Sequence, residues 1–195
     1  MQDLDPDPVI QFGRWFAEAQ AQGVPQSEAM SLATAGPDGR PSVRMVLLKG
    51  WGPDGFVWFT GYESRKGEEL DLNPRAALLF FWQPMGRQVR IEGSVEKTTR
   101  QESQVYFQTR PVGSQVAAAI SRQSRPIGSR AELEAAYAAL AAEAGEGPLP
   151  LPEAWGGYRL RPDAFEFWEH RENRLHDRLR YQRDGAGWSR TRLQP

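Results

Sequence analysis

The stretch MSLATAGPDGRPSVRMVLLKGWGPDGFVWFT, residues 30–60, decides the fold class. It holds three segments rich in strand-forming residues, separated by two copies of Gly-Pro-Asp-Gly. Asp-Gly between apolar strand segments is a strong hairpin signal. We therefore predict strands over 30–35, 41–49 and 56–60, joined by tight turns into an antiparallel meander.

The segments outside this stretch alternate between helical and strand patterns. Residues 8–23 repeat apolar side chains at helical spacing, with Pro8 suited to the start and Gly23 to the end. Further helices are predicted over 64–72, 99–109, 112–121 and 131–143. Further strands are predicted over 75–82, 88–96, 158–161, 164–168, 174–183 and 188–193. Strands first, helices in the middle and strands last predict an α+β fold in which short antiparallel strands close into a small barrel.

The composition limits the possible functions. The 195 residues suit a single domain, and a formal net charge of −1 argues against a nucleic-acid binder. Without cysteine there is no disulfide or thiolate chemistry, and with two histidines we expect no His-rich metal site. No segment resembles a signal peptide or a membrane helix, so we expect a cytoplasmic protein.

The closing segment RENRLHDRLRYQR, residues 171–183, concentrates positive charge. Read as a strand, it places Arg174, His176, Arg178 and Arg180 on one face, because side chains alternate along a strand. Cations side by side repel one another unless an anion lies against them. The alternative is the solvated outer face of an edge strand.

Other basic residues fall where an anion could bind. Arg44 and Lys49 lie in one predicted strand but on opposite faces, so a shared ligand needs a bulge, a twist or two subunits. Arg65 and Lys66 follow Ser64 at a predicted helix start, where free N–H groups favour phosphate. Two more groups occur at Arg87–Arg90 and at Tyr106–Ser114, where Tyr106 and Arg110 are predicted to share one helix face and Ser114 follows one turn later. Each signal is weak alone, and together they predict two phosphate-sized anions.

Nine short motifs resemble one known family. They are RMVLLK (44–49), FT (59–60), SRK (64–66), RQV (87–89), YFQTRPVGSQ (106–115), SRQS (121–124), WGGYR (155–159), EFW (166–168) and NRLHDR (173–178). In this order they resemble the pyridoxine/pyridoxamine 5′-phosphate oxidase family, and the resemblance covers nearly the whole chain.

The resemblance implies a fold and an activity. The fold would be an FMN-binding split barrel of Greek-key type with peripheral helices, formed by residues 1–195 as one domain, with C-terminal dimerisation strands over about 155–195. The protein would be a homodimer with FMN at the subunit interface. It would oxidise pyridoxine 5′-phosphate or pyridoxamine 5′-phosphate to pyridoxal 5′-phosphate, with O2 as electron acceptor and H2O2 as product.

The resemblance also implies roles for individual residues. FMN would be bound by Arg44, Met45, Val46, Leu47, Leu48, Lys49, Phe59, Thr60, Arg65, Lys66, Gln88, Gln123, Ser124, Trp168 and Arg178. The substrate would be bound by Lys49, Tyr106, Arg110, Ser114, Arg174 and His176. Of these, Arg174 and His176 would be catalytic, orienting the oxidised end of the substrate, and His176 could accept a proton.

The chain departs from the family pattern in three places. Glu169 and His170 replace a common Gln-Gly pair after the site tryptophan, and Phe59 replaces a common tyrosine. Many members also carry a lid segment ahead of the Asp-Leu-x-x-Asp-Pro motif. Here that motif begins at Asp3, so we expect the lid to be absent.

Two other functions fit the sequence. A related flavin oxidase of the phenazine-biosynthesis type would keep the FMN residues and lose the substrate-phosphate residues. A non-catalytic protein that stores FMN or pyridoxal phosphate would keep both sets without turnover. A membrane or nucleic-acid partner is not expected.

Overall fold

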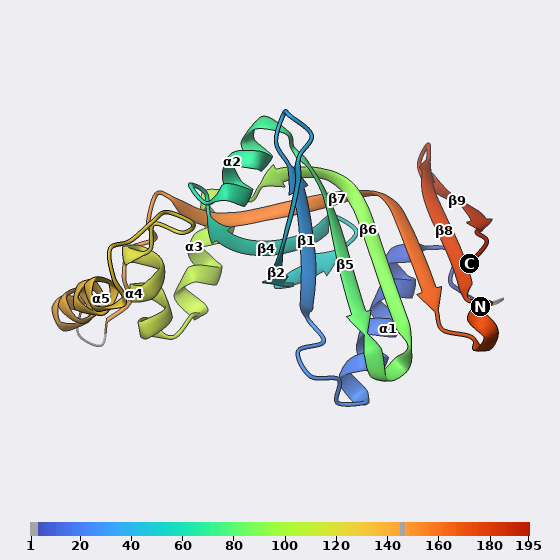
Figure 1. The fold of residues 1–195 in the computed structure, drawn as a ribbon, viewed down its shortest axis with the longest axis horizontal. Helices are drawn as coiled ribbons and strands as arrows, with labels where there is room; N and C mark the ends of the chain where they lie inside the picture. The colour runs from blue at the N-terminus through green and yellow to red at the C-terminus, as the bar shows by residue number, and fades with distance from the viewer. Residues whose placement is uncertain (1–3, 145–146) are drawn as a thin grey trace.

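A computed structural model describes residues 4–144 and 147–195, which form one curled antiparallel sheet with helices around it (Figure 1). The α-helices are α1 Pro8–Ala21, α2 Arg65–Leu72, α3 Arg100–Thr109, α4 Val112–Ile120 and α5 Arg130–Ala144. The strands are β1 Ala29–Ala35, β2 Pro41–Leu47, β3 Gly50–Gly52, β4 Gly55–Gly61, β5 Arg75–Trp82, β6 Arg87–Lys97, β7 Trp155–Glu169, β8 Asp177–Asp184 and β9 Gly187–Arg192. The predicted α+β class is confirmed. The predicted absence of a lid before Asp3 concerns residues outside the described ranges.

The predicted three-strand meander is only partly correct. Strands β1 and β2 form the expected hairpin, with Ala35 opposite Pro41. Strand β4, however, pairs with β3 and with the distant β7 rather than with β2. The cause is that β2 ends at Leu47, and the Lys49 N–H then donates to the Val57 carbonyl at 2.8 Å. Strands β2 and β4 therefore come close without pairing, which leaves the barrel open between them.

The longest strand, β7, replaces two shorter predicted strands. Its first half pairs with β4 and its second half with β8, while β6 follows the other edge. A register shift opposite Glu92 and Gly93 accommodates Pro162, which has no N–H to donate. A Cβ on Gly93 would lie 2.0 Å from the Arg161 carbonyl oxygen, so this close approach requires glycine.

The main core lies between the sheet and α1. The Asp7 side chain caps this helix by accepting from the Val9 N–H at 2.8 Å. Phe12 is fully buried against the rings of Phe56 and Phe80, at centroid distances of 4.9 Å and 5.0 Å. Burial of such rings contributes roughly 2–3 kcal/mol each, so this contact fixes α1 to the sheet.

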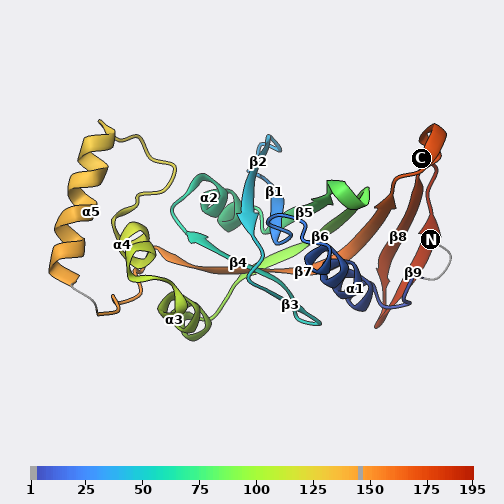
Figure 2. The ribbon, with the colours of Figure 1, turned by 90° about the horizontal axis from the view of Figure 1, so that it is seen from below.

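The two ends of the molecule are built differently (Figures 1 and 2). Helices α3, α4 and α5 lie at one end, over a second small core that includes Phe107, Val116 and Trp155. Strands β8 and β9 lie at the other end. Strand β7 runs between the two ends.

The predicted strand 174–183 begins later than expected. Residues Glu172–Arg174 form a single 3₁₀ turn, and β8 starts at Asp177. Asn173 and Arg174 have φ values of 55° and 61°, and two left-handed residues in succession cannot continue a strand. The prediction that Arg174 and His176 share a strand face with Arg178 and Arg180 is therefore wrong. Within β8 only Arg178 and Arg180 alternate in this way.

No helix in the described ranges combines the length and the apolar character needed to span a bilayer.

Candidate active site

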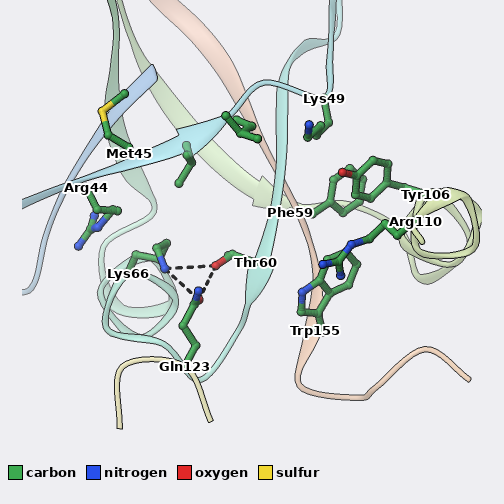
Figure 3. Close-up of a pocket in the computed structure, with 12 residues that line it drawn as sticks. Arg44, Met45, Lys49, Phe59, Thr60, Lys66, Tyr106, Arg110, Gln123 and Trp155 are labelled. Carbon is green, nitrogen blue, oxygen red and sulfur yellow. Dashed lines mark hydrogen bonds between the residues drawn. The ribbon is translucent and has the colours of Figure 1, made fainter. Parts of the chain in front are cut away.

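The pocket that gathers most of the predicted site residues opens where β2 and β4 separate. It is a pocket of about 500 Å³ that β2, β4, α2, α3 and the segment after α4 surround. Its lining residues are Arg44, Met45, Val46, Leu47, Lys49, Phe59, Thr60, Lys66, Tyr106, Arg110, Gln123 and Trp155. Figure 3 shows Arg44 and Lys66 on one side of the pocket and Arg110 on the other.

Lys66 is a buried cation whose hydrogen-bond partners are all neutral. Its ammonium donates to Gln123 Oε1 at 3.0 Å, Thr60 Oγ1 at 3.2 Å and Ser64 Oγ at 3.3 Å. Burial and the nearby Arg44 charge lower the pKa of Lys66 to about 8, against the opposing effect of Glu69. A buried ammonium that donates only to neutral oxygens is stabilised by an anion that enters the pocket.

Glu69 organises the arginines beside Lys66. It accepts hydrogen bonds from Thr34 at 2.5 Å, Ser42 at 2.6 Å, Arg65 at 2.8 Å and Arg44 at 3.3 Å. Burial opposes ionisation of this carboxyl group, but the four hydrogen bonds outweigh it and lower the pKa of Glu69 to about 2. Arg44 reaches the pocket wall, whereas Arg65 is mostly exposed and lies outside it.

On the opposite side of the pocket, aromatic rings lie beside Arg110. The Phe59 and Tyr106 rings stack at 4.0 Å, and Trp155 continues the stack at 5.6 Å from Phe59. The Arg110 guanidinium carbon lies 4.9 Å from the Trp155 ring centroid. Arg110 caps the end of α3 with extended backbone, so it does not extend the helix face of Tyr106 as predicted.

A second cluster of predicted site residues lies far from this pocket. Gln88, Trp168 and Arg178 stand opposite one another on β6, β7 and β8 and so share one sheet face. The His176 ring packs 4.6 Å from the Trp168 ring, and its Nδ1 accepts from the Arg171 N–H at 3.2 Å.

The length of β7 separates the two clusters within one chain. Trp155 at the start of the strand lines the pocket, and Trp168 near its end belongs to the second cluster. At roughly 3.3 Å per residue, the path from Trp155 to Trp168 extends about 40 Å along the strand. Because β7 runs from one end of the molecule to the other (Figure 2), one bound molecule of cofactor size does not reach both clusters of the same chain.

The chain matches two described protein regions. Residues 16–142 match the pyridoxamine 5′-phosphate oxidase family, and residues 155–195 match the pyridoxine 5′-phosphate oxidase C-terminal dimerisation region. The chain belongs to the pyridoxamine 5′-phosphate oxidase family. The resemblance seen in the sequence is therefore confirmed at the level of the family.

Named members of this oxidase family are similar over almost the entire chain. The pyridoxine/pyridoxamine 5′-phosphate oxidase of Rubrobacter xylanophilus is 57% identical over 98% of this chain and 88% of its own. The protein of the same name from a Janthinobacterium species is 56% identical over 99% of this chain and 92% of its own.

Solved structures confirm the split-barrel prediction. PhzG from Burkholderia lata 383, in complex with tetrahydrophenazine-1-carboxylic acid, is 36% identical with a TM-score of 0.93, covering 100% of this chain and 95% of its own. A pyridoxamine 5′-phosphate oxidase-related, FMN-binding protein from Nostoc punctiforme has a TM-score of 0.75 at 18% identity, covering 93% of this chain and 96% of its own, and shows the shared fold.

The pocket collects about half of the residues that the family resemblance predicts. It brings together Arg44, Met45, Val46, Leu47, Lys49, Phe59, Thr60, Lys66, Tyr106, Arg110 and Gln123. Leu48 points into the core, in keeping with a predicted contact through its main chain alone. The residues outside the pocket are Arg65, Gln88, Ser114, Ser124, Trp168, Arg174, His176 and Arg178.

Two residues at the pocket were not predicted. Trp155 lines it, and Glu69 holds Arg44 and Arg65 from behind. A signal for Glu69 exists in the sequence, because it lies four residues after Arg65 on a predicted helix, the spacing of an ion pair. From the sequence alone, Trp155 is expected to be a core residue, and only its place in the WGGYR motif connects it with the site.

Proposed function

We propose that the chain is an FMN-dependent oxidase that converts pyridoxine 5′-phosphate or pyridoxamine 5′-phosphate to pyridoxal 5′-phosphate. The observation that carries the proposal is Arg110, whose Nη1 is buried beside the pocket with no hydrogen-bond partner in the described structure. A buried guanidinium without an anion is unfavourable until a ligand supplies one. A phosphate monoester fits, because a guanidinium can donate two parallel hydrogen bonds to it.

The other side of the pocket fits the phosphate of FMN. Lys66, Arg44 and the hydroxyl of Thr60 are the groups that would hold it, and the exposed backbone of β2 would face the flavin ring. The buried ammonium of Lys66 supports this assignment, since it has only neutral partners at hydrogen-bond distance. When bound, FMN supplies the two-electron oxidation, with O2 as the final acceptor.

We further propose that two copies of the chain complete each site. Strand β2 is an edge of the sheet, and Val43, Met45 and Leu47 on it are 69%, 61% and 40% exposed. An apolar edge strand that lines a pocket is a surface that a partner covers. The match to a dimerisation region supports a homodimer in which Trp168 and Arg178 come from the partner subunit.

The residues that we assign to the oxidised end of the substrate are Arg174 and His176, which lie just before β8. Arg174 is exposed and makes no hydrogen bond or ion pair within the described ranges, so its charge is available. His176 accepts a backbone hydrogen bond at Nδ1, which places the proton of the neutral ring on Nε2. This tautomer favours donation to the substrate amine or alcohol rather than proton abstraction by Nε2.

FMN affinity is expected to fall as pH rises through about 8. In the free protein Lys66 loses its proton near that pH, whereas a bound phosphate dianion favours the protonated ammonium. The dissociation constant should be flat near neutrality and rise by up to about tenfold per pH unit above pH 8. Flavin fluorescence quenching between about pH 7 and pH 9.5 measures it.

The matched control for this profile is Lys66→Met. That variant should bind FMN more weakly at neutral pH and show little change up to pH 9.5. A wild-type profile as flat as that of Lys66→Met would contradict the role of Lys66.

An oxidase acting on a reduced phenazine carboxylate is the second candidate, because the PhzG structure is 36% identical with a TM-score of 0.93. The test is anaerobic reduction of the bound flavin, followed at its visible absorbance. We expect pyridoxamine 5′-phosphate to bleach the flavin in a single turnover, and readmitted O2 to restore the colour with formation of H2O2. Bleaching by a dihydrophenazine carboxylate alone would favour the second candidate, and no bleaching by either would favour a storage protein.

A further inference from the structure

Arg110 differs from Arg44, which also lines the pocket, and from the neighbouring Arg65 in the groups that hold its guanidinium. Arg44 and Arg65 are paired with the Glu69 carboxylate. Arg110 has no carboxylate within ion-pair distance in the described ranges, although burial lowers its pKa against the opposing effect of Tyr106. The protein therefore keeps this guanidinium partly desolvated without neutralising it, and some other group must stabilise the charge.

Aromatic rings take the place of the carboxylate. The Arg110 guanidinium lies 4.9 Å from the Trp155 ring centroid and 5.8 Å from that of Phe107. An indole face is the strongest of the cation–π partners, contributing about 1–2 kcal/mol at partly desolvated sites. Figure 3 shows Arg110 beside the Trp155 ring at the wall of the pocket.

The Trp155 ring is itself held in place. It is 8% exposed and packs edge-on against Phe107 at 5.2 Å and parallel to Phe59 at 5.6 Å. Its position at the start of β7 is fixed by pairing with Gly61 of β4. A ring locked on two sides offers one geometry to the guanidinium, which reduces the entropy lost when a ligand binds.

We propose that Trp155 is a positioning residue that gives the site its selectivity for phosphorylated substrates, by holding Arg110 in place with its charge free for a phosphate monoester. The inference rests on the proposed function and adds a residue to it. A carboxylate in the position of Trp155 would orient Arg110 equally well, but it would compete with the substrate phosphate for the same N–H donors. The ring does not compete, because it interacts with the face of the guanidinium and leaves the donors at its edge.

The experiment compares holoenzymes of wild type, Trp155→Phe and Trp155→Met. For each, kcat/KM is measured with pyridoxamine 5′-phosphate and with pyridoxamine, and the ratio of the two reports phosphate selectivity. We expect the ratio to fall about tenfold or more in Trp155→Met, through KM for the phosphorylated substrate. The selectivity ratio of Trp155→Phe should lie between those of wild type and Trp155→Met, since a benzene face binds a guanidinium less strongly than an indole face does.

A control and a second readout separate positioning from general damage. Arg183 lies 4.0 Å from the Trp188 ring centroid on the C-terminal hairpin, so Trp188→Leu removes a similar arginine–tryptophan pair outside the pocket. Trp188→Leu should keep the wild-type ratio. Calorimetric titration with inorganic phosphate should show weaker binding to Trp155→Met than to wild type, in proportion to the lost selectivity.

Failure of the inference and failure of the proposed function give different results in these measurements. An unchanged ratio and unchanged phosphate affinity in both Trp155 variants would overturn the inference. If Trp155→Met does not fold, the test rests on Trp155→Phe alone. A selectivity ratio for Trp155→Phe equal to that of wild type would then overturn the inference. If wild type oxidises neither substrate, the proposed function fails, and the phosphate titration still tests whether Trp155 positions Arg110.

Discussion

Arg110→Ala is expected to lower kcat/KM for pyridoxamine 5′-phosphate about 10²- to 10³-fold, a loss of about 3–4 kcal/mol in transition-state binding. The reason is that Arg110 has no carboxylate partner in the described structure and its buried Nη1 has no hydrogen bond, so the substrate phosphate can pair with its guanidinium directly. The loss should appear mainly in KM, because the phosphate is remote from the carbon that is oxidised. Steady-state kinetics under air, with pyridoxal phosphate detected by its absorbance, measures it.

Two further results should accompany that loss. The variant should keep FMN and be at least as stable as wild type, because it removes a buried charge that the free protein does not pair. Arg130→Ala is the matched control, since Arg130 is exposed on α5 and its ion pair in the described ranges is with Glu134. A KM for Arg110→Ala equal to that of the control would contradict the assignment of the substrate phosphate.

Arg174→Ala is expected to lower kcat/KM about 10²-fold while FMN affinity stays near that of wild type. Arg174 and Asn173 have left-handed backbones, and such strain persists where function fixes a conformation. Its exposed guanidinium lacks a partner in the described ranges, so the loss cannot be attributed to a broken internal ion pair. Single-turnover flavin reduction measures the effect on the oxidation step itself.

The neighbouring strand provides the control for Arg174→Ala. Arg180 is an exposed arginine of β8 whose guanidinium donates to Gln182 at 2.8 Å. In Arg180→Ala, the substrate should reduce the bound flavin at the wild-type rate. An Arg174→Ala rate equal to that of Arg180→Ala would remove Arg174 from the site.

Local features of the fold were predictable from the sequence because they depend on neighbours in the chain. The 36–39 turn and its two strands form as the Gly-Pro-Asp-Gly signal predicts. Helix α2 starts after Ser64, whose side chain accepts from the Gly67 N–H as an N-cap residue does. The identity of strand partners was not predictable, since β4 pairs with β7, about a hundred residues away.

Strand alternation failed where the backbone leaves the strand region. It grouped Arg174 and His176 with Arg178 on one face, but the turn at Asn173 and Arg174 places the first two before the strand. His176 and Arg178 nevertheless belong to one region, because the His176 ring packs on Trp168, which pairs with Arg178. The sequence thus predicted the cluster but not its geometry.

Pocket residues separated in sequence were predicted only through the family resemblance. Lys66 and Gln123 meet at 3.0 Å although 57 residues separate them. Trp155 was missed because a buried tryptophan in a strand reads as core, and its contact with Arg110 depends on how α3 packs against β7. A cation–π contact between distant elements leaves no pattern in the sequence.

Each proposed active site needs two chains, because it joins the Arg110 pocket of one chain to Arg174 of the other. The most direct test uses heterodimers of Arg110→Ala and Arg174→Ala, co-expressed with two different tags and purified over both. Each parent homodimer carries the defect in both sites. In the heterodimer one site receives both substitutions and the other receives none.

We predict that the purified heterodimer recovers about half of the wild-type activity per dimer, far above either parent, because a twofold interface pairs unlike surfaces of the two chains at each site. Heterodimer activity no higher than that of the parents would mean that one chain holds both arginines at one site, and it would contradict the account.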